Sequence, residues 1–295
     1  MRKLIFMAAV IISCTAGAQT AVKKPAILYG QCTKDSLYSE PFGQWFKTGY
    51  DNYKPDITTV TALKAQKLND ITIEIFFGSW CGDSKRELPG FLQILNTISF
   101  PEKKLSVIGV GDSDSLTKQS PRHQEAGKGI FRVPTFIVYR NGVEINRINE
   151  YPVLSLEKDL LQILSNQPYT SNYPSFALIN RWLKEGTLQD VNISTRSLSG
   201  QLATVVKNEN ELNSLGYMLL KQGKKEDASK IFQVNYYLFP ESANVVSSLG
   251  EGYYENNDMT RAVYFLEKSL EMNKDPKAVQ GILSILYKAK EKEKS

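Results

Sequence analysis

Hydrophobic and polar positions in the first half of the chain predict alternating strands and helices. Residues 71–77 are rich in β-branched and aromatic side chains, which is typical of a buried strand, and residues 106–110 form a second apolar run. The sequence between them predicts a helix over residues 83–96. This order, strand then helix then strand, favours a parallel pair joined by a crossover helix.

Two further strands are expected over residues 135–139 and 143–148. They flank Asn141 and Gly142, and both residue types tolerate the positive φ of a tight hairpin turn. An amphipathic helix over residues 154–164 follows. Because the last two strands pair antiparallel, we expect a mixed sheet flanked by helices.

The segment before this unit, residues 19–66, has a weaker pattern. A strand is expected over residues 26–29 and a helix over 42–50. Pro55 interrupts the chain before another expected helix, over residues 61–67. We regard this segment as an N-terminal extension.

The first 18 residues have the features of a secretory signal peptide. A short basic start precedes an apolar run over residues 4–12, and the small residues at 16 and 18 suit signal peptidase. The run is too short to cross a bilayer as a helix, and we expect no membrane span elsewhere. Residues 1–18 therefore predict export to the periplasm. In the alternative interpretation Cys14 is lipidated and anchors the protein to a membrane.

Beyond residues 168–205, a linker in which we expect helical segments, the sequence repeats itself with a period of 34 residues. The matched pairs are Leu215 and Leu249, Gly216 and Gly250, Leu219 and Tyr253, Ala228 and Ala262, and Phe232 and Leu266. Small residues allow two helices to approach closely, and large residues fill the space between them.

This period and these positions resemble the tetratricopeptide (TPR) repeat, a pair of helices joined by a turn. The resemblance implies an all-α region over residues 206–295, with a third partial unit from about Lys277 as a cap. Two repeats and a cap offer a small surface. It serves either to bind a partner protein, or to pack on the first domain or on a second copy of the chain.

Cys81 carries the most specific chemical signal. Trp80 and Cys81 directly follow a predicted buried strand and open a predicted helix. A thiol at a helix N-terminus faces unpaired N–H groups and the positive end of the helix dipole, and both favour the thiolate. Lys85 and Arg86 would add to this effect, whereas Asp83 would oppose it.

These residues belong to an ordered set, and the set resembles the thioredoxin family over residues 67–167. Its members here are Trp80, Cys81, Pro89, Val133, Pro134 and Thr135. The resemblance implies an α/β thioredoxin-like fold and a cis peptide bond before Pro134. It also implies that the backbone of residues 133–135 holds a client peptide in extended form beside Cys81, with Trp80 as a wall of the site.

Two departures from the family pattern change the expected chemistry. Ser84 stands where the family has its second cysteine, so this motif cannot close a disulfide on itself. Ile75 stands where many thioredoxins bury an acidic residue. What remains is attack by Cys81 on a client disulfide, or trapping of a client as a mixed disulfide. Ser84 would then either hydrogen-bond the thiolate or cap the helix.

Cys32 lies in the N-terminal extension, and its role stays open. It either resolves a mixed disulfide at Cys81, forms a static disulfide with Cys81, or is an unreactive thiol. In the first case it would act as a resolving cysteine. In the others, release of a client needs an outside thiol.

Composition limits the remaining function classes. A chain of 295 residues with 42% hydrophobic and 23% charged residues suits about two globular domains. The net charge is +5, or +3 (5 minus 2) once Arg2 and Lys3 are removed, which is too small to predict nucleic-acid binding. With one histidine and three cysteines we expect no metal and no cofactor. We expect His123 at the surface, and Asp112 and Asp114 in a turn.

Two functional hypotheses follow. In the first, an exported thioredoxin-like protein exchanges thiols and disulfides, or traps client thiols, through Cys81, while a TPR tail contacts a partner. In the second, the chain is a non-enzymatic adaptor whose two halves both serve protein binding.

Overall fold

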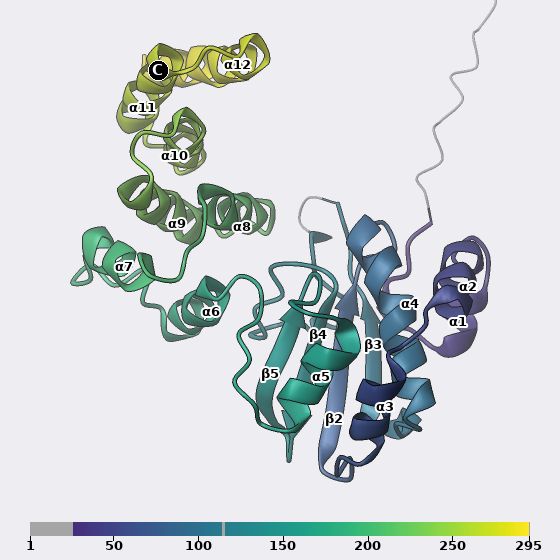
Figure 1. The fold of residues 1–295 in the computed structure, drawn as a ribbon. Coiled ribbons are helices and arrows are strands. Elements are labelled where there is room, and N and C mark those ends of the chain that lie inside the picture. The colour runs from purple at the N-terminus through teal and green to yellow at the C-terminus, as the bar shows by residue number, and fades with distance from the viewer. Residues whose placement is uncertain (1–25, 114–115, 295) are drawn as a thin grey trace, which may run out of the picture.

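The structure is a computed structural model, and it describes residues 26–113 and 116–294. The predicted signal peptide, Cys14 and Asp114 lie outside the described residues. Figure 1 shows two regions, a sheet flanked by helices and a curved row of helices that leads away from it. Within the described ranges, no helix is both long enough and apolar enough to cross a membrane.

The described residues form one five-stranded mixed sheet with the strand order β1-β3-β2-β4-β5. The strands are β1 (Gly30–Gln31), β2 (Ile71–Phe77), β3 (Leu105–Gly109), β4 (Thr135–Arg140) and β5 (Val143–Asn149). Strand β2 pairs parallel with β3 and antiparallel with β4. The expected hairpin joins β4 to β5, and Asn141 and Gly142 have φ values of 52° and 78°.

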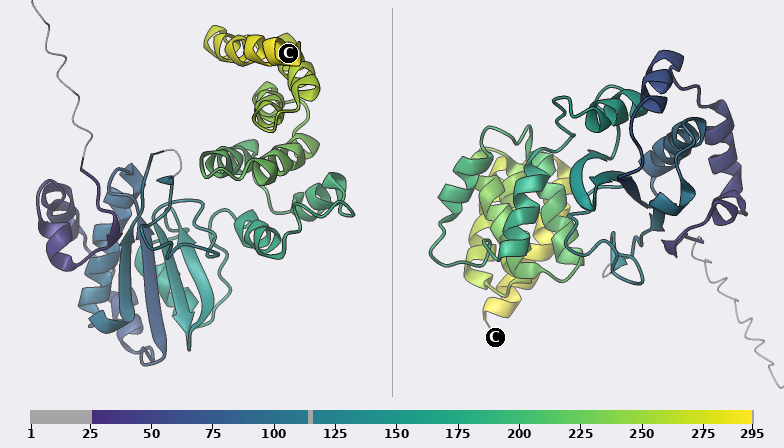
Figure 2. Two further views of the ribbon diagram at one scale, coloured as in Figure 1. Left: turned by 180° about the vertical axis from the view of Figure 1, so that it is seen from behind. Right: turned by 90° about the horizontal axis from the view of Figure 1, so that it is seen from below.

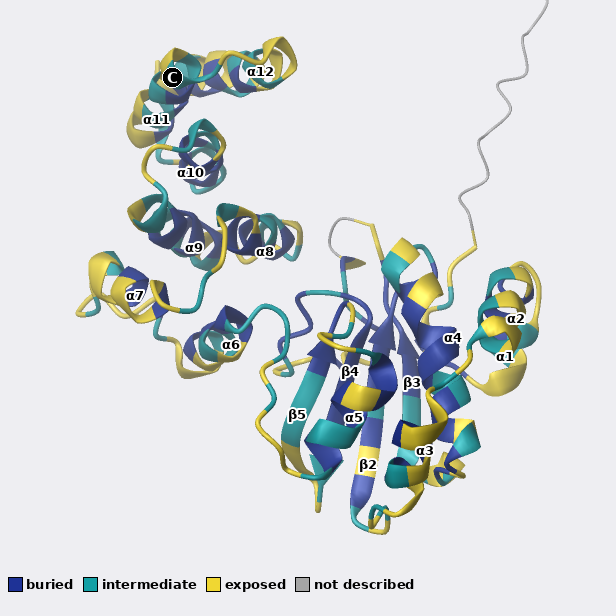
Figure 3. Ribbon diagram, viewed as in Figure 1, coloured by how far each residue is buried: buried dark blue, intermediate teal, exposed yellow. Residues whose placement is uncertain are grey.

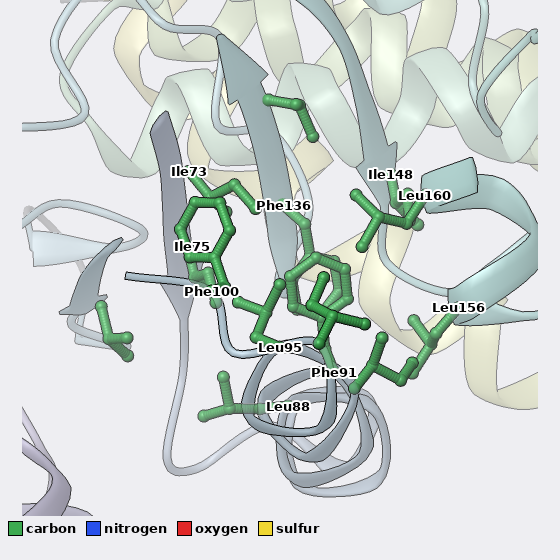
Figure 4. Close-up of a cluster of buried hydrophobic side chains, with 14 of the residues drawn as sticks. Ile73, Ile75, Leu88, Phe91, Leu95, Phe100, Phe136, Ile148, Leu156 and Leu160 are labelled. Atoms are coloured by element: carbon green, nitrogen blue, oxygen red, sulfur yellow. The ribbon is translucent and has the colours of Figure 1, made fainter. Parts of the chain in front are cut away.

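Helices cover one face of this sheet (Figure 1). They are α3 (Ile57–Lys64), α4 (Gly82–Thr97) and α5 (Leu156–Leu164), with α1 (Lys34–Tyr38) and α2 (Gly43–Asn52) outside α4 and a short 3-10 turn, η1 (Glu102–Lys104), before β3. The side chains between sheet and helices form the main core, and Figure 4 shows Phe91 of α4 lying beside Phe136 of β4. Their ring centroids are 4.3 Å apart. Figure 3 shows the burial that results on the inner sides of these elements.

A long connection covers part of the opposite face of the sheet, near the carboxyl ends of β2 and β3 (Figure 2). Between β3 and β4, the described residues form no α-helix. A second buried cluster forms there from Phe76, Ile108, Val110, Ile130, Val133 and Ile137. At its rim, Glu74 accepts hydrogen bonds from Lys128 at 2.5 Å and from the Tyr139 hydroxyl at 2.7 Å.

The second half of the chain is helical. Its elements are α6 (Ser175–Glu185), α7 (Thr195–Leu202), α8 (Glu209–Lys221), α9 (Lys225–Leu238), α10 (Ala243–Glu255), α11 (Met259–Met272) and α12 (Pro276–Glu293). Consecutive helices from α8 onward pack against each other. A Cβ atom added at Gly216 would lie 2.4 Å from the ring of Phe232, and one at Gly250 would lie 2.8 Å from Leu266. The 34-residue period therefore places small residues of one helix against large residues of the next.

The N-terminal extension departs most from expectation. The helix expected over residues 61–67 is α3, and it begins earlier because the Asp56 side chain accepts the Thr59 N–H at 2.8 Å and caps the helix start. The strand expected over residues 26–29 lies later, as β1. There Cys32 extends the pairing, since its N–H donates to the Val107 carbonyl at 2.8 Å.

Candidate functional site

Cys81 is the N-cap residue of α4, at the corner where the chain turns from β2 into this helix. Its backbone is extended, with φ −86° and ψ 129°, and no side chain caps the helix start by a hydrogen bond. The thiol is half-buried, and Sγ donates to the carbonyl oxygen of Val133 at 3.3 Å. The sulfur therefore lies between the unpaired N–H groups of a helix N-terminus and the segment that precedes β4.

That segment contains the cis peptide bond between Val133 and Pro134 that the family resemblance implied. Thr135 begins β4, is fully buried, and donates its hydroxyl to the Arg132 carbonyl at 2.7 Å. The Pro134 carbonyl accepts the N–H of Glu150 at 2.7 Å. The structure thus brings Cys81 together with the three residues predicted around the cis-proline.

Trp80 stands beside Cys81 and packs on the same buried cluster. Its indole Nε1 donates to the Val110 carbonyl at 3.0 Å. The ring lies against Gly78, where an added Cβ would be only 2.5 Å from it. Glycine at position 78 therefore allows the ring to lie flat on the end of β2, and Trp80 forms a fixed wall next to the thiol.

Ser84 has a role that neither sequence interpretation included. Its side chain is fully buried, and its hydroxyl oxygen accepts the Gly78 N–H at 3.1 Å. This hydrogen bond ties the end of β2 to the first turn of α4. Ser84 therefore holds the corner that presents Cys81, and it does not cap the helix. Ile75 is fully buried in the main core.

The charges near Cys81 differ from those expected. Arg86 pairs with Asp83 and with Glu87, at 2.6 Å in each case, so its charge is compensated on its own helix. Burial raises the pKa of Glu87, and Arg86 acts against this rise. Lys118, which no motif singled out, interacts electrostatically with Cys81 from the long connection.

Cys32 and Cys81 are both free thiols, and they pack on opposite faces of the sheet. Cys32 is only 7% exposed, and its Sγ lies 3.4 Å from the Gly30 carbonyl oxygen. Burial raises the pKa of the Cys32 thiol. The static disulfide that the sequence left open is therefore absent, because β1 directs Cys32 into the main core. Resolution by Cys32 stays a prediction, and it would require this sulfur to reach the other face.

The helical region borders the site through α8. Arg132 donates to the Ser214 hydroxyl of α8 at 2.6 Å and lies 3.5 Å from a carboxylate oxygen of Glu150. Its guanidinium lies over the ring of Tyr173, 5.0 Å from the centroid. Just past α8, the Gln222 side chain donates to the Thr117 carbonyl at 3.0 Å. The connection between β3 and β4 is thus tied to the second half of the chain at two points.

His123 lies at the surface as expected, with its side chain 68% exposed and Nδ1 3.3 Å from Glu125. The described residues contain no group of three or more histidine, cysteine, aspartate or glutamate side chains placed to hold a metal ion. Comparison of the sequence with models of known protein families and with curated proteins gives no match.

Proposed function

We propose that this chain is a thioredoxin-like protein that exchanges thiols and disulfides with client proteins through Cys81. The main support is the position of the sulfur, half-buried at the N-terminus of α4 and opposite the cis-proline segment. The mixed sheet, with β2 and β3 parallel and β4 and β5 in a hairpin, agrees with this family assignment. Export, proposed from residues 1–18, would supply clients that carry disulfides.

The proposed reaction begins when the Cys81 thiolate attacks one sulfur of a client disulfide. A bond forms between Cys81 and that sulfur, and the other client sulfur leaves as a thiolate that takes a proton from water. Ser84 has no thiol to complete the exchange, and its hydroxyl is engaged by Gly78. An outside thiolate then attacks the Cys81 sulfur and releases the client as a thiol. A second outside thiol restores Cys81 and leaves as a disulfide.

The helices from α8 to α12 have the proposed role of a TPR-type contact region. The close helix pairs at Gly216 and Gly250 support that assignment. The hydrogen bond from Arg132 to Ser214 supports this role, because it joins α8 to the segment before the cis-proline. A partner bound to these helices would therefore lie next to the reactive thiol.

Trapping of a mixed disulfide tests the reaction. The full chain is mixed with a peptide whose cysteine carries a good leaving thiol, and adduct formation is followed by intact mass. With Cys14 replaced by serine throughout, we expect the parent chain and Cys32→Ser to form the adduct faster than an unstructured cysteine peptide does, and Cys81→Ser to form none. An adduct retained in Cys81→Ser, or a rate equal to that of the unstructured peptide, would overturn the proposal.

A second candidate function is that of a non-enzymatic adaptor. The observation that favours it is the buried hydrogen bond from Gly78 to Ser84, which makes the second cysteine position a structural one. In that case Cys81→Ser should leave partner binding unchanged. Partners are co-purified from cells that carry wild type or Cys81→Ser, with and without reductant. Partners retained in Cys81→Ser and in reductant favour the adaptor, whereas partners lost in both cases favour thiol–disulfide exchange.

A further inference from the structure

A cavity of about 380 Å³ lies between the connection that precedes the cis-proline and the helices α6 and α8. It is open to solvent on one side. The side chains that matter for its chemistry are Lys118, His123, Glu125, Phe131, Lys184 and Lys224. They come from both halves of the chain, so the cavity exists only because the helical region docks beside the sheet.

The side chains that line the cavity carry an excess of positive charge. Among the described residues that line it, Glu125 is the only carboxylate, and its oxygens are engaged within the connection. Oε2 accepts the Ser120 N–H at 2.9 Å and the Ser120 hydroxyl at 2.6 Å, and Oε1 faces His123. None of the three lysine ammonium groups forms an ion pair or hydrogen bond with another described residue.

Lys118 connects this cavity to the thiol. It lines the cavity and interacts electrostatically with Cys81. Burial lowers the pKa of Lys118, the positive charges of Arg132 and Lys221 act in the same direction, and the negative charges of Cys81 and Asp112 oppose them. An ammonium group in such surroundings gains from a bound anion, which would offset both its desolvation and its like-charged neighbours.

The backbone makes a second connection. Ile130 and Phe131 form part of the cavity wall, and the chain then runs directly to Val133, whose carbonyl accepts the Cys81 thiol. A polypeptide held in extended form along the cis-proline segment would therefore continue into the cavity. Lysine ammonium groups on flexible stems suit carboxylates, and Phe131, Leu183 and Met218 offer apolar contact beside them.

We propose that this cavity binds the carboxylate side chains of an acidic client segment, so that the client cysteine beside that segment reaches Cys81. The inference rests on the proposed function, and it adds the class of client. Selectivity would then come from charge near the cysteine, through faster association and better positioning of the acidic client.

Two peptides of equal length test this selectivity. One carries glutamates beside an activated cysteine, and the other carries glutamines at the same positions. We expect the full chain to form a mixed disulfide with the acidic peptide at least roughly tenfold faster at low salt. This advantage should shrink at about 0.5 M salt, because the Debye length then falls to a few ångström and charges further apart no longer attract each other.

Lysine variants locate the effect. The double variant Lys184→Gln, Lys224→Gln should lose the preference for the acidic peptide while keeping its rate with the neutral one, because both lysines line the cavity and Lys118, which interacts with Cys81, is left in place. Lys103→Gln is the control, because Lys103 is exposed and lies far from the cavity. It lies in η1, just before the start of β3, whereas Cys81 follows the end of β2, which runs parallel to β3. This control should keep the preference. Equal rates for both peptides in wild type, or an unchanged preference in the double variant, would overturn the inference.

The same measurements separate this inference from the proposed function. Reaction of the neutral peptide through Cys81 tests the exchange chemistry, and the ratio of the two rates tests the cavity. If neither peptide reacts, binding is measured in Cys81→Ser by the fluorescence anisotropy of labelled peptides. Tighter binding of the acidic peptide that is lost in the double lysine variant supports the cavity. Equal binding of both peptides, or competition by inorganic phosphate as strong as by the acidic peptide, contradicts it.

Discussion

Replacing Gly216 by alanine tests how closely α8 packs on α9. The added Cβ would lie 2.4 Å from one ring carbon of Phe232 and 2.6 Å from the next. Carbon atoms in good contact lie about 3.5–4.0 Å apart, so the ring or the helix must shift by about 1 Å or more. The change therefore inserts a methyl group where the structure has no space for one.

The Phe232 ring has little freedom to give way. It is fully buried, the ring of Tyr217 packs edge-on against it at 5.1 Å, and Gly252 of α10 approaches from another side. Overpacking a core costs about 1–3 kcal/mol, whereas the higher helix propensity of alanine relative to glycine stabilises the helix by at most about 1 kcal/mol. Because the ring is confined, we expect a net loss of about 1–2 kcal/mol in local stability.

Gly281→Ala is the matched control. Gly281 lies within α12, and an added Cβ there would meet nothing within 4 Å. The same chemical change should therefore stabilise this helix, by about 0.5–1 kcal/mol. The two substitutions are identical in composition and opposite in expected sign.

Hydrogen exchange followed by mass spectrometry on the full chain reports each helix separately. In Gly216→Ala, amides of α8 and α9 should exchange roughly 5- to 30-fold faster, whereas Gly281→Ala should slow exchange in α12. In a Phe232→Ala background the Gly216 substitution should cost less, because the ring it would strike is gone. If Gly216→Ala protects α8 as Gly281→Ala protects α12, the close helix pair is wrong, and with it the repeat interpretation.

Two further predictions concern the sheet region. Ser84→Ala leaves the buried Gly78 N–H without its acceptor, so the unfolding free energy measured in urea should fall by about 1–3 kcal/mol. An unchanged unfolding free energy would mean that the turn from β2 into α4 does not depend on this hydrogen bond. Burial raises the pKa of Cys32 above its ordinary value of 9.0, so above that pH the unfolded chain releases a proton that the folded protein retains. The unfolding free energy should therefore decline as pH rises through 9.0, and a decline of equal size in Cys32→Ala would refute this cause.

Local patterns predicted much of the fold. The strand over residues 71–77 has the observed bounds of β2, because a buried run of β-branched and aromatic residues is a signal contained within the run itself. The β4–β5 hairpin follows from Asn141 and Gly142 in the same way. In contrast, α3 begins at Ile57, because the cap at Asp56 outweighs a weak apolar pattern.

The candidate site also has features that the sequence predicted and features that it did not. The approach of Cys81 to the segment around Pro134 was predictable, because the motifs that carry it resemble those of a family with known geometry. The acceptor role of Ser84 was not, since it depends on how the turn at Gly78 folds back on α4. Lys118 had no distinguishing signal in a polar stretch, and its place near Cys81 results from the path of the connection across the sheet.

The missing second thiol changes what the rest of the molecule must do. A dithiol site can release any client by internal attack, so it tolerates weak recognition. Here Ser84 is held by Gly78, and Cys32 lies across the sheet. Under the proposed function, a client bound at Cys81 would therefore stay until an outside thiol arrived, unless Cys32 reached the other face of the sheet. A long-lived adduct with the wrong protein would block the site. Under the proposed function, selection would then have to precede the chemistry, and we propose that the lysine-lined cavity beside α8 binds the client before its sulfur reacts.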